Sequence, residues 1–189
     1  GNSAPIGAGL VNAFTGYSFD SGLFVAFSTI SGNTAQPVKP PHLQSSGVSP
    51  AATAAYDESA GGGIAQVEGL VVVAHSTLTG NSAGYGGGMA NVGSYGLLIN
   101  STLSGNSARY AGGGIANKYA FLRLDNSTIV GNTATFGGGI HSDGGTTTRS
   151  TCTSRGTASG ALETSTTRTP WRSATRYTSF FTGQASPST

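Results

Sequence analysis

One short sequence pattern occurs four times along this chain, and its last three copies follow one another at an almost constant spacing. The copies read STISGNTA, STLTGNSAGYGGGMAN, STLSGNSARYAGGGIAN and STIVGNTATFGGGIHS, and they begin at residues 28, 76, 101 and 127. Glycine triplets begin at residues 61, 86, 112 and 137, so their spacing hardly varies and matches that of the last three copies. A fixed period between about 20 and 50 residues predicts a solenoid, a propeller or another repeat array.

Apolar and amide side chains hold their place from copy to copy. Three residues after the first glycine of each triplet stands Ile or Met. For the first three triplets, Leu or Ile stands seventeen residues after that glycine and Asn stands twenty residues after it. These columns contain Ile64, Met89, Ile115 and Ile140; Leu78, Leu103 and Ile129; and Asn81, Asn106 and Asn132. Columns of like residues are expected when each coil stacks on the next, so we predict that these residues form structural ladders.

Within each period, short strand-like segments alternate with turn signals. Apolar Leu122 and Leu124 alternate with charged Arg123 and Asp125, which is the period of a strand with one buried face. The Gly-Asn pairs indicate turns, because both residues tolerate a positive φ. Glycine also costs about 1 kcal/mol at a helix position. The sequence therefore predicts an all-β chain folded as a parallel β-helix, with about 25 residues per coil and coils roughly 4.8 Å apart.

Two stretches depart from the repeat, which otherwise covers residues 1–145. Residues 36–55 contain four of the seven prolines, and proline cannot donate a hydrogen bond to a strand ladder. This stretch is either an excursion loop or a corrupted half-coil. The opening Gly-Asn-Ser-Ala matches residues 80–83, so we expect the chain to begin inside a coil, with further coils upstream.

The second stretch, residues 146–189, is an irregular tail with 14 Thr, 8 Ser and 5 Arg. Such a composition is typical of a low-complexity segment. We favour a reading-frame change as the origin of the tail. When the last base of each codon is read with the first two bases of the next, residues 153–158 and 162–167 can encode repeat words. In that case the tail has no evolved fold.

Charge is sparse and unevenly distributed along the chain. Only 8% of the residues are charged, and the net charge of +2 combines −2 over residues 1–145 with +4 over residues 146–189. The predicted solenoid therefore has no excess of positive charge, and we expect no nucleic-acid partner. Cys152 is the only cysteine, which excludes an intrachain disulfide. The longest apolar run, residues 70–74, is far too short for a membrane-spanning segment.

The Ser-Thr-[Ile/Leu]-x-Gly-Asn-[Ser/Thr]-Ala words and the glycine triplets of residues 1–145 resemble the right-handed parallel β-helix repeats of polymorphic outer-membrane proteins and autotransporter-like surface proteins. The resemblance implies a right-handed, pectin-lyase-like β-helix, export, and display at a bacterial cell surface or outer membrane. It also implies membership of a class in which adhesins are common. The resemblance does not extend to residues 36–55 or 146–189.

The pectin-lyase-like fold also hosts enzymes that cleave polysaccharides, so an enzyme is an alternative. Such enzymes need two carboxylates about 5–10 Å apart, or a carboxylate cluster that holds a calcium ion. The acidic residues of the repeat region are Asp20, Asp57, Glu58, Glu68, Asp125 and Asp143. Glu68 and Asp143 are expected three coils apart. Asp57 and Glu58 are adjacent in the sequence, and adjacent residues in a strand point to opposite faces. We therefore predict no catalytic residue, no metal site and no cofactor.

Two sets of outward residues are candidate binding surfaces. Tyr85, Tyr110 and Phe136 flank the glycine triplets, where they form either an aromatic edge for a sugar ring or a stack that covers a turn. The second set is Thr77, Thr102 and Thr128, each of which precedes an inward Leu or Ile. A flat Thr-x-Thr array is the kind of surface that ice-binding solenoids use. The second column changes to Ser and Val, however, and threonine is also simply a good strand residue.

His75 shares a column with Asn100 and Asn126, which belong to two N-glycosylation sequons. Because like residues recur at this position, we expect the two asparagines in an internal ladder and His75 as a cap of the same turn.

These patterns predict a non-catalytic β-solenoid, and the resemblance implies that the chain is a fragment of an exported protein with a structural or adhesive role, located outside the cell at a bacterial surface or outer membrane. Its flat flanks suit weak contacts with a glycan or a host surface protein, and its uncapped ends allow end-to-end association. The first alternative is a polysaccharide-acting enzyme or glycan-binding module with a pectin-lyase-like fold. The second is an ice-binding β-solenoid.

Overall fold

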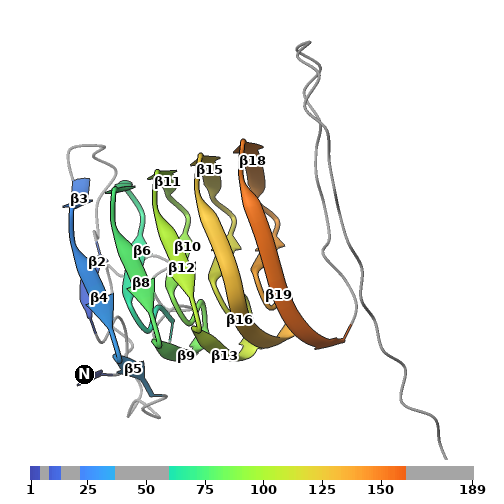
Figure 1. Cartoon of the computed structure of the whole chain (residues 1–189). Coiled ribbons are helices and arrows are strands. Elements are labelled where there is room, and N and C mark those ends of the chain that lie inside the picture. Colours follow the sequence, from blue (N-terminus) through green and yellow to red (C-terminus); the bar gives the residue numbers. More distant parts are fainter. Residues whose placement is uncertain (5–8, 14–21, 37–59, 161–189) are drawn as a thin grey trace, which may run out of the picture.

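The computed structural model describes residues 1–4, 9–13, 22–36 and 60–160. The strands of successive coils lie side by side, so this part of the chain forms a parallel β-solenoid (Figure 1). Its residues form no helix, and so none that is long and apolar enough to span a membrane. The predicted all-β fold with stacked parallel coils is confirmed.

Three parallel sheets run along the stack. Sheet A has the order β1 (Ser3–Ala4), β5 (Thr34–Ala35), β9 (Ser82–Tyr85), β13 (Ser107–Ala111), β16 (Thr128–Phe136), β12 (Thr102–Ser104), β8 (Thr77–Thr79) and β4 (Thr29–Ser31), with β19 (Thr153–Gly160) paired to β16. Sheet B has the order β17 (Ile140–Asp143), β14 (Ile115–Lys118), β10 (Met89–Val92), β6 (Ile64–Val67) and β2 (Leu10–Ala13). Sheet C has the order β18 (Thr146–Ser150), β15 (Phe121–Asp125), β11 (Tyr95–Ile99), β7 (Leu70–Ala74) and β3 (Gly22–Ala26).

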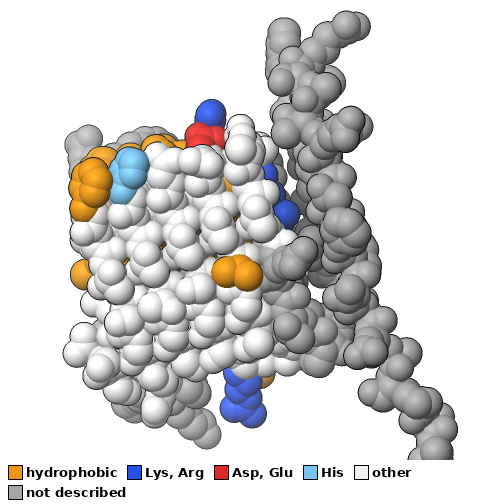
Figure 2. Space-filling model, viewed as in Figure 1, with side chains coloured by type: hydrophobic (Ala, Val, Ile, Leu, Met, Phe, Trp, Pro, Cys, Tyr) orange, Lys and Arg blue, Asp and Glu red, His pale blue; other side chains and the backbone are white. Residues whose placement is uncertain are grey.

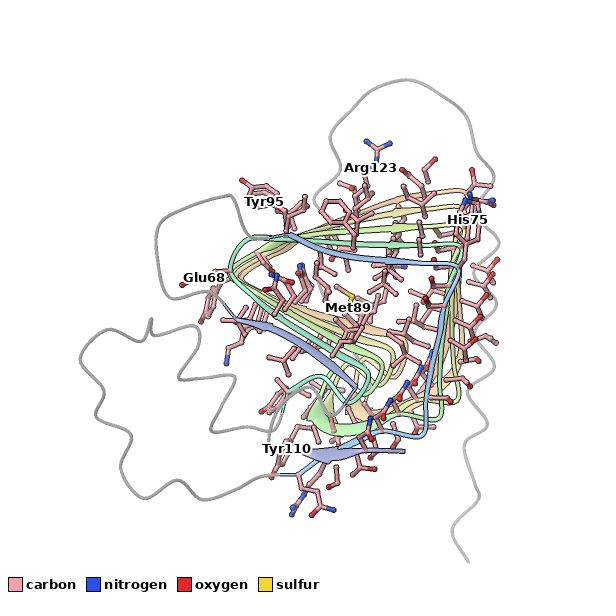
Figure 3. All side chains as sticks on the ribbon, turned by 90° about the vertical axis from the view of Figure 1, so that its left-hand side faces the viewer. Glu68, His75, Met89, Tyr95, Tyr110 and Arg123 are labelled. Carbon is pink, nitrogen blue, oxygen red and sulfur yellow. The ribbon has the colours of Figure 1, made fainter. Side chains whose placement is uncertain are left out.

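The predicted apolar columns lie inside the stack. Met89 pairs in register with Ile64 on one side and with Ile115 on the other, and its side chain is 0% exposed. Seen along the stack, the three sheets enclose an interior into which Met89 points (Figure 3). The Leu78, Leu103 and Ile129 column belongs to the same core cluster as the Met89 column. Burial of each such side chain contributes about 1.5–3 kcal/mol relative to exposure.

The glycine triplets are required because neighbouring coils approach closely at this corner. The first glycine of the triplet has a positive φ, 62° at Gly86 and 68° at Gly112, a conformation that glycine adopts without steric cost. A Cβ at the second position, Gly113, would lie 2.4 Å from the carbonyl oxygens of Thr133 and Gly138. Both oxygens belong to the backbone of the next coil, so any side chain at Gly113 would force two coils apart.

A β-bulge in β13 explains why the step from the triplet at Gly86 to the triplet at Gly112 is longer than the other steps. Ala108 pairs with Ala83, but the next registered pair is Ala111 with Tyr85, so β13 has one residue more than β9 in this interval. A bulge leaves the extra residue outside the regular ladder and can re-aim its side chain. Tyr110 lies in this interval and projects outward from the corner (Figure 3).

Strands β18 and β19 continue the stack beyond residue 145, where the repeat words end. Strand pairing uses backbone N–H and C=O groups, and threonine is favoured in strands, so this coil forms although its inward residues are no longer aliphatic. Thr147 takes the place of Leu122, and Ser154 takes that of Ile129. Strand pairing thus reaches Gly160, further than the predicted boundary of the repeat. The remainder of the tail, 161–189, and nearly all of the off-pattern stretch 36–55 lie outside the described residues.

Candidate functional site

The asparagine column forms a hydrogen-bonded ladder inside sheet A. The side-chain oxygen of each asparagine accepts from both the backbone N–H and the side-chain amide of the asparagine in the preceding coil, at 2.9–3.1 Å. Each amide also donates to the carbonyl oxygen of a core residue, as Asn106 does to Leu78 at 3.0 Å. These bonds satisfy buried backbone groups at a turn, and they give Asn81, Asn106 and Asn132 a structural role.

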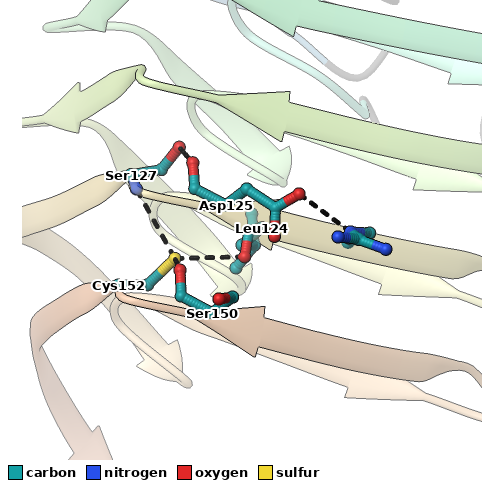
Figure 4. A network of polar contacts seen from close by, with 6 residues as sticks. Leu124, Asp125, Ser127, Ser150 and Cys152 are labelled. Carbon is teal, nitrogen blue, oxygen red and sulfur yellow. Dashed lines mark hydrogen bonds and ion pairs between the residues drawn. The ribbon is translucent and has the colours of Figure 1, made fainter. Parts of the chain in front are cut away.

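Two further hydrogen-bonded ladders were not predicted from the sequence. In the first, the backbone N–H of Ser28, Ser76 and Ser101 donates to the hydroxyl of Ser76, Ser101 and Ser127, at 3.1–3.2 Å. Cys152 ends this ladder: its Sγ lies 3.5 Å from the Ser127 nitrogen and 3.2 Å from the Leu124 oxygen (Figure 4). The second ladder lies inside sheet B, where Asn12 donates to Gln66 and Asn91 donates to Asn117.

The three predicted aromatic residues come together at one pocket. Tyr85, Tyr110 and Phe136 line a cavity of about 260 Å³ on the outside of sheet B, which we call the aromatic pocket. The rings of Tyr85 and Tyr110 lie 5.2 Å apart, centroid to centroid, with a tilt of 34°. The Arg109 guanidinium carbon lies 5.2 Å from the Tyr110 centroid, within the range of a cation–π contact.

The floor of the aromatic pocket is apolar and one side is polar. Ala90, Val92 and Ala116 form the floor, where the outward side chains of β10 and β14 are buried. Lys118, His141 and Asp143 form the polar side, from β14 and β17. Pairing in register brings Ala116 beside His141 and Lys118 beside Asp143. The pocket therefore combines ring faces, an apolar floor and groups that can donate and accept hydrogen bonds.

His141 is the one pocket residue with an unsatisfied buried atom among the described residues. Its Nδ1 is buried and has no hydrogen-bond partner. A buried polar atom without a partner costs free energy comparable to a lost hydrogen bond. A ligand in the aromatic pocket that reaches this imidazole would lower that cost.

The carboxylates that the structure describes lie in three separate places. Asp143 lies in the aromatic pocket, Glu68 lies at a corner (Figure 3), and Asp125 accepts from Arg123 Nε at 2.8 Å on sheet C. No group of three or more His, Cys, Asp or Glu side chains that could hold a metal ion occurs within the described ranges. Asp20, Asp57 and Glu58 lie outside them.

The threonine column faces outward on sheet A, as its sequence pattern predicts. Thr77, Thr102 and Thr128 pair in register on β8, β12 and β16 and are half-buried. The inward neighbours in these strands, Leu78 and Leu103, are fully buried.

The sequon asparagines are exposed, so the expected internal ladder at Asn100 and Asn126 is wrong. His75, Asn100 and Asn126 have φ values of 49°, 49° and 46°, and this left-handed turn directs their side chains outward. They form an external column instead, in which Asn126 donates to Asn100 at 2.6 Å. Phe27 stacks on His75 at the end of the column, with 4.9 Å between ring centroids.

The fold and its internal ladders define the class of this protein as a parallel β-solenoid. No family model matches the chain, and no curated protein or solved structure matches it. The function has to be inferred from the surface of the solenoid itself.

Proposed function

We propose that this protein is an exported, non-catalytic β-solenoid that acts at a bacterial cell surface as a structural and adhesive element, and that its adhesive site is the aromatic pocket, with a glycan as ligand. The observation that supports this proposal is that the ring pair Tyr85–Tyr110 lies in the same pocket as the polar side formed by β14 and β17. Pyranose rings present an apolar face to aromatic rings and a rim of hydroxyls to hydrogen-bonding groups.

The geometry of the pocket favours weak and repeated contact over enclosure of a ligand. A volume of about 260 Å³ is below the range of about 300–1,000 Å³ typical of pockets that bury small molecules. Such a site contacts one or two sugar units and gains strength when many copies act together. Export and surface display are supported by the resemblance of the repeat words to those of polymorphic outer-membrane and autotransporter-like proteins. The pectin-lyase-like relationship rests on the same resemblance.

The experiment is a glycan-binding screen with two tyrosine variants. Tyr110→Ala removes one ring of the pocket, and because Tyr110 is 41% exposed the core is unaffected. We expect binding of a retained glycan to weaken by about 3- to 10-fold, the equivalent of roughly 0.7–1.4 kcal/mol. Tyr95→Ala is the matched control, because Tyr95 is 49% exposed and lies on a different side of the solenoid (Figure 3).

Three outcomes contradict the proposal. The unchanged protein binds no glycan, or Tyr95→Ala weakens binding as much as Tyr110→Ala does. Release of reducing ends from a bound polysaccharide would show that the solenoid is an enzyme.

A further inference from the structure

A single column of threonines runs through five coils of sheet A. Pairing in register links Thr29 to Thr77, Thr77 to Thr102, Thr102 to Thr128 and Thr128 to Thr153. The column adds Thr29 and Thr153 to the three threonines found from the repeat words. Coils are spaced roughly 4.8 Å apart, so the hydroxyl and methyl groups recur at that interval. We call the outer side of β4, β8, β12, β16 and β19 the threonine face.

A second outward column accompanies the first on the same strands. It contains Ser31, Thr79, Ser104 and Val130 in register. Residues two apart in a strand are separated by roughly 6.6 Å, so the two columns define a two-dimensional grid. The Ser104 hydroxyl donates to Thr79 Oγ1 at 3.2 Å. Val130 pairs with Arg155 of β19, so the uncharged residues of the second column are those of β4, β8, β12 and β16.

Two hydrogen-bonded ladders hold the strands of the threonine face in place. Strands β4, β8 and β12 and residues 128–130 of β16 each lie between the serine ladder and the asparagine ladder, which tie the backbone of one coil to the next. Between two neighbouring coils, Ser76 N–H donates to Ser101 Oγ at 3.2 Å and Asn81 N–H donates to Asn106 Oδ1 at 2.9 Å. Such side-chain bonds to the backbone hold the grid on both sides of these strands, and they preorganise it for a regular partner.

The chemistry of the threonine face favours ordered water over a sugar or a charged partner. Within the part of the chain that the structure describes, the side chains of Thr77, Thr102 and Thr128 take part in no hydrogen bond, so their hydroxyls are available. Figure 2 looks onto this face, which is largely free of hydrophobic and charged side chains, with the charged ones at its margins. The aromatic residues suited to sugar rings, Tyr85, Tyr110 and Phe136, line the separate aromatic pocket.

We propose that the threonine face binds ice. The two spacings of the grid are close to the oxygen repeats of the hexagonal ice lattice, and the uncharged hydroxyl and methyl groups of threonine can hold a water layer with that spacing. This activity uses a different surface from the aromatic pocket, and it does not depend on glycan binding.

The test is inhibition of ice recrystallisation in frozen sucrose solution by the purified full chain. We expect the unchanged protein to keep ice crystals small and the double variant Thr102→Tyr/Thr128→Tyr to lose this effect, because two bulky rings break the grid. The matched control is Thr148→Tyr, since Thr148 is an exposed strand threonine on sheet C. Thr148→Tyr and Tyr110→Ala should both retain the full effect.

Folding of each variant is checked by circular dichroism. If the double variant is unfolded, Thr102→Lys decides in its place, because one strongly hydrated charge within the grid should also abolish the inhibition. The proposal is overturned if the unchanged protein does not slow recrystallisation, or if Thr148→Tyr loses the effect as fully as the double variant. It is also overturned if the protein is inactive on ice but binds crystalline cellulose through Thr102 and Thr128, because the face would then belong to a flat polysaccharide.

Discussion

Asn81 donates its side-chain amide to the side-chain oxygen of Asn106 across 3.0 Å, in the closed interior of the solenoid. The same oxygen accepts from the backbone N–H of Asn81 at 2.9 Å, and the Asn106 amide donates to Leu78 and Asn132. Asn106 is 0% exposed, so no water can replace any of these partners. Each coil thus holds the next one through side chains as well as through strand pairing.

Asn106→Leu is expected to destabilise the protein strongly. The change keeps the size of the side chain but leaves the buried Asn81 N–H without its acceptor, at a cost of about 1–3 kcal/mol, and it removes one donor from the Leu78 carbonyl. Urea unfolding should show a midpoint well below that of the unchanged protein. Thr79→Leu, at an outward position of the neighbouring coil, is the control and should shift the midpoint little. An unchanged midpoint for Asn106→Leu would falsify the structural role of the ladder.

The apolar and asparagine columns were predictable because burial acts on every coil in the same way. A position that faces the interior of one coil faces it in all, so Leu78 and Leu103 are alike, and the period alone reveals them. The same reasoning failed at Asn100 and Asn126, because a recurring column identifies an equivalent position but not its direction. Their left-handed φ turns the side chains outward, and nothing in the residue type distinguishes them from Asn106.

The serine ladder and the polar side of the aromatic pocket could not be predicted for related reasons. Ser76 and Ser101 recur as a column, but serine is common in exposed turns, so the column does not show that these hydroxyls are buried. Lys118, His141 and Asp143 meet only because β14 and β17 pair in register. One signal was present in the sequence: the longer step between the second and third glycine triplets marks the bulge that displaces Tyr110.

Gly113→Ala should destabilise the solenoid far more than an ordinary glycine substitution. The added methyl would lie 2.4 Å from two backbone oxygens of the next coil, so the coils must separate and lose core packing. Gly105→Ala is the matched control: its φ is 61° but it has open space around it, and we expect a cost of about 1 kcal/mol for the backbone strain. Thermal unfolding should rank the variants in that order, and equal losses would mean that the corner has room for a side chain.

Cys152→Ser should stabilise the last described coil. Cys152 occupies the ladder position of Ser76, Ser101 and Ser127, but its sulfur lies 3.5 Å from the Ser127 nitrogen. A hydroxyl is a stronger and shorter acceptor for this N–H, and we expect a gain of about 0.5–1.5 kcal/mol in the free energy of unfolding. Cys152→Ala, which removes the acceptor, should destabilise instead. Hydrogen exchange at the Ser127 amide reports both effects, and identical exchange in the two variants would argue that this coil is not docked.

Ser154→Val should also raise stability, for the opposite chemical reason. Ser154 pairs with Ile129, so it takes the next position in the inward column that is aliphatic in the earlier coils. Its Oγ is buried without a hydrogen-bond partner. Replacing the hydroxyl by methyl groups removes the orphan polar atom and extends the apolar ladder, which is worth about 1–2 kcal/mol. The control is Thr153→Val at the neighbouring outward position, which should change stability by less than half as much. If Ser154→Val instead lowers the urea midpoint, strands β18 and β19 do not continue the solenoid, and the stack ends where the repeat words end.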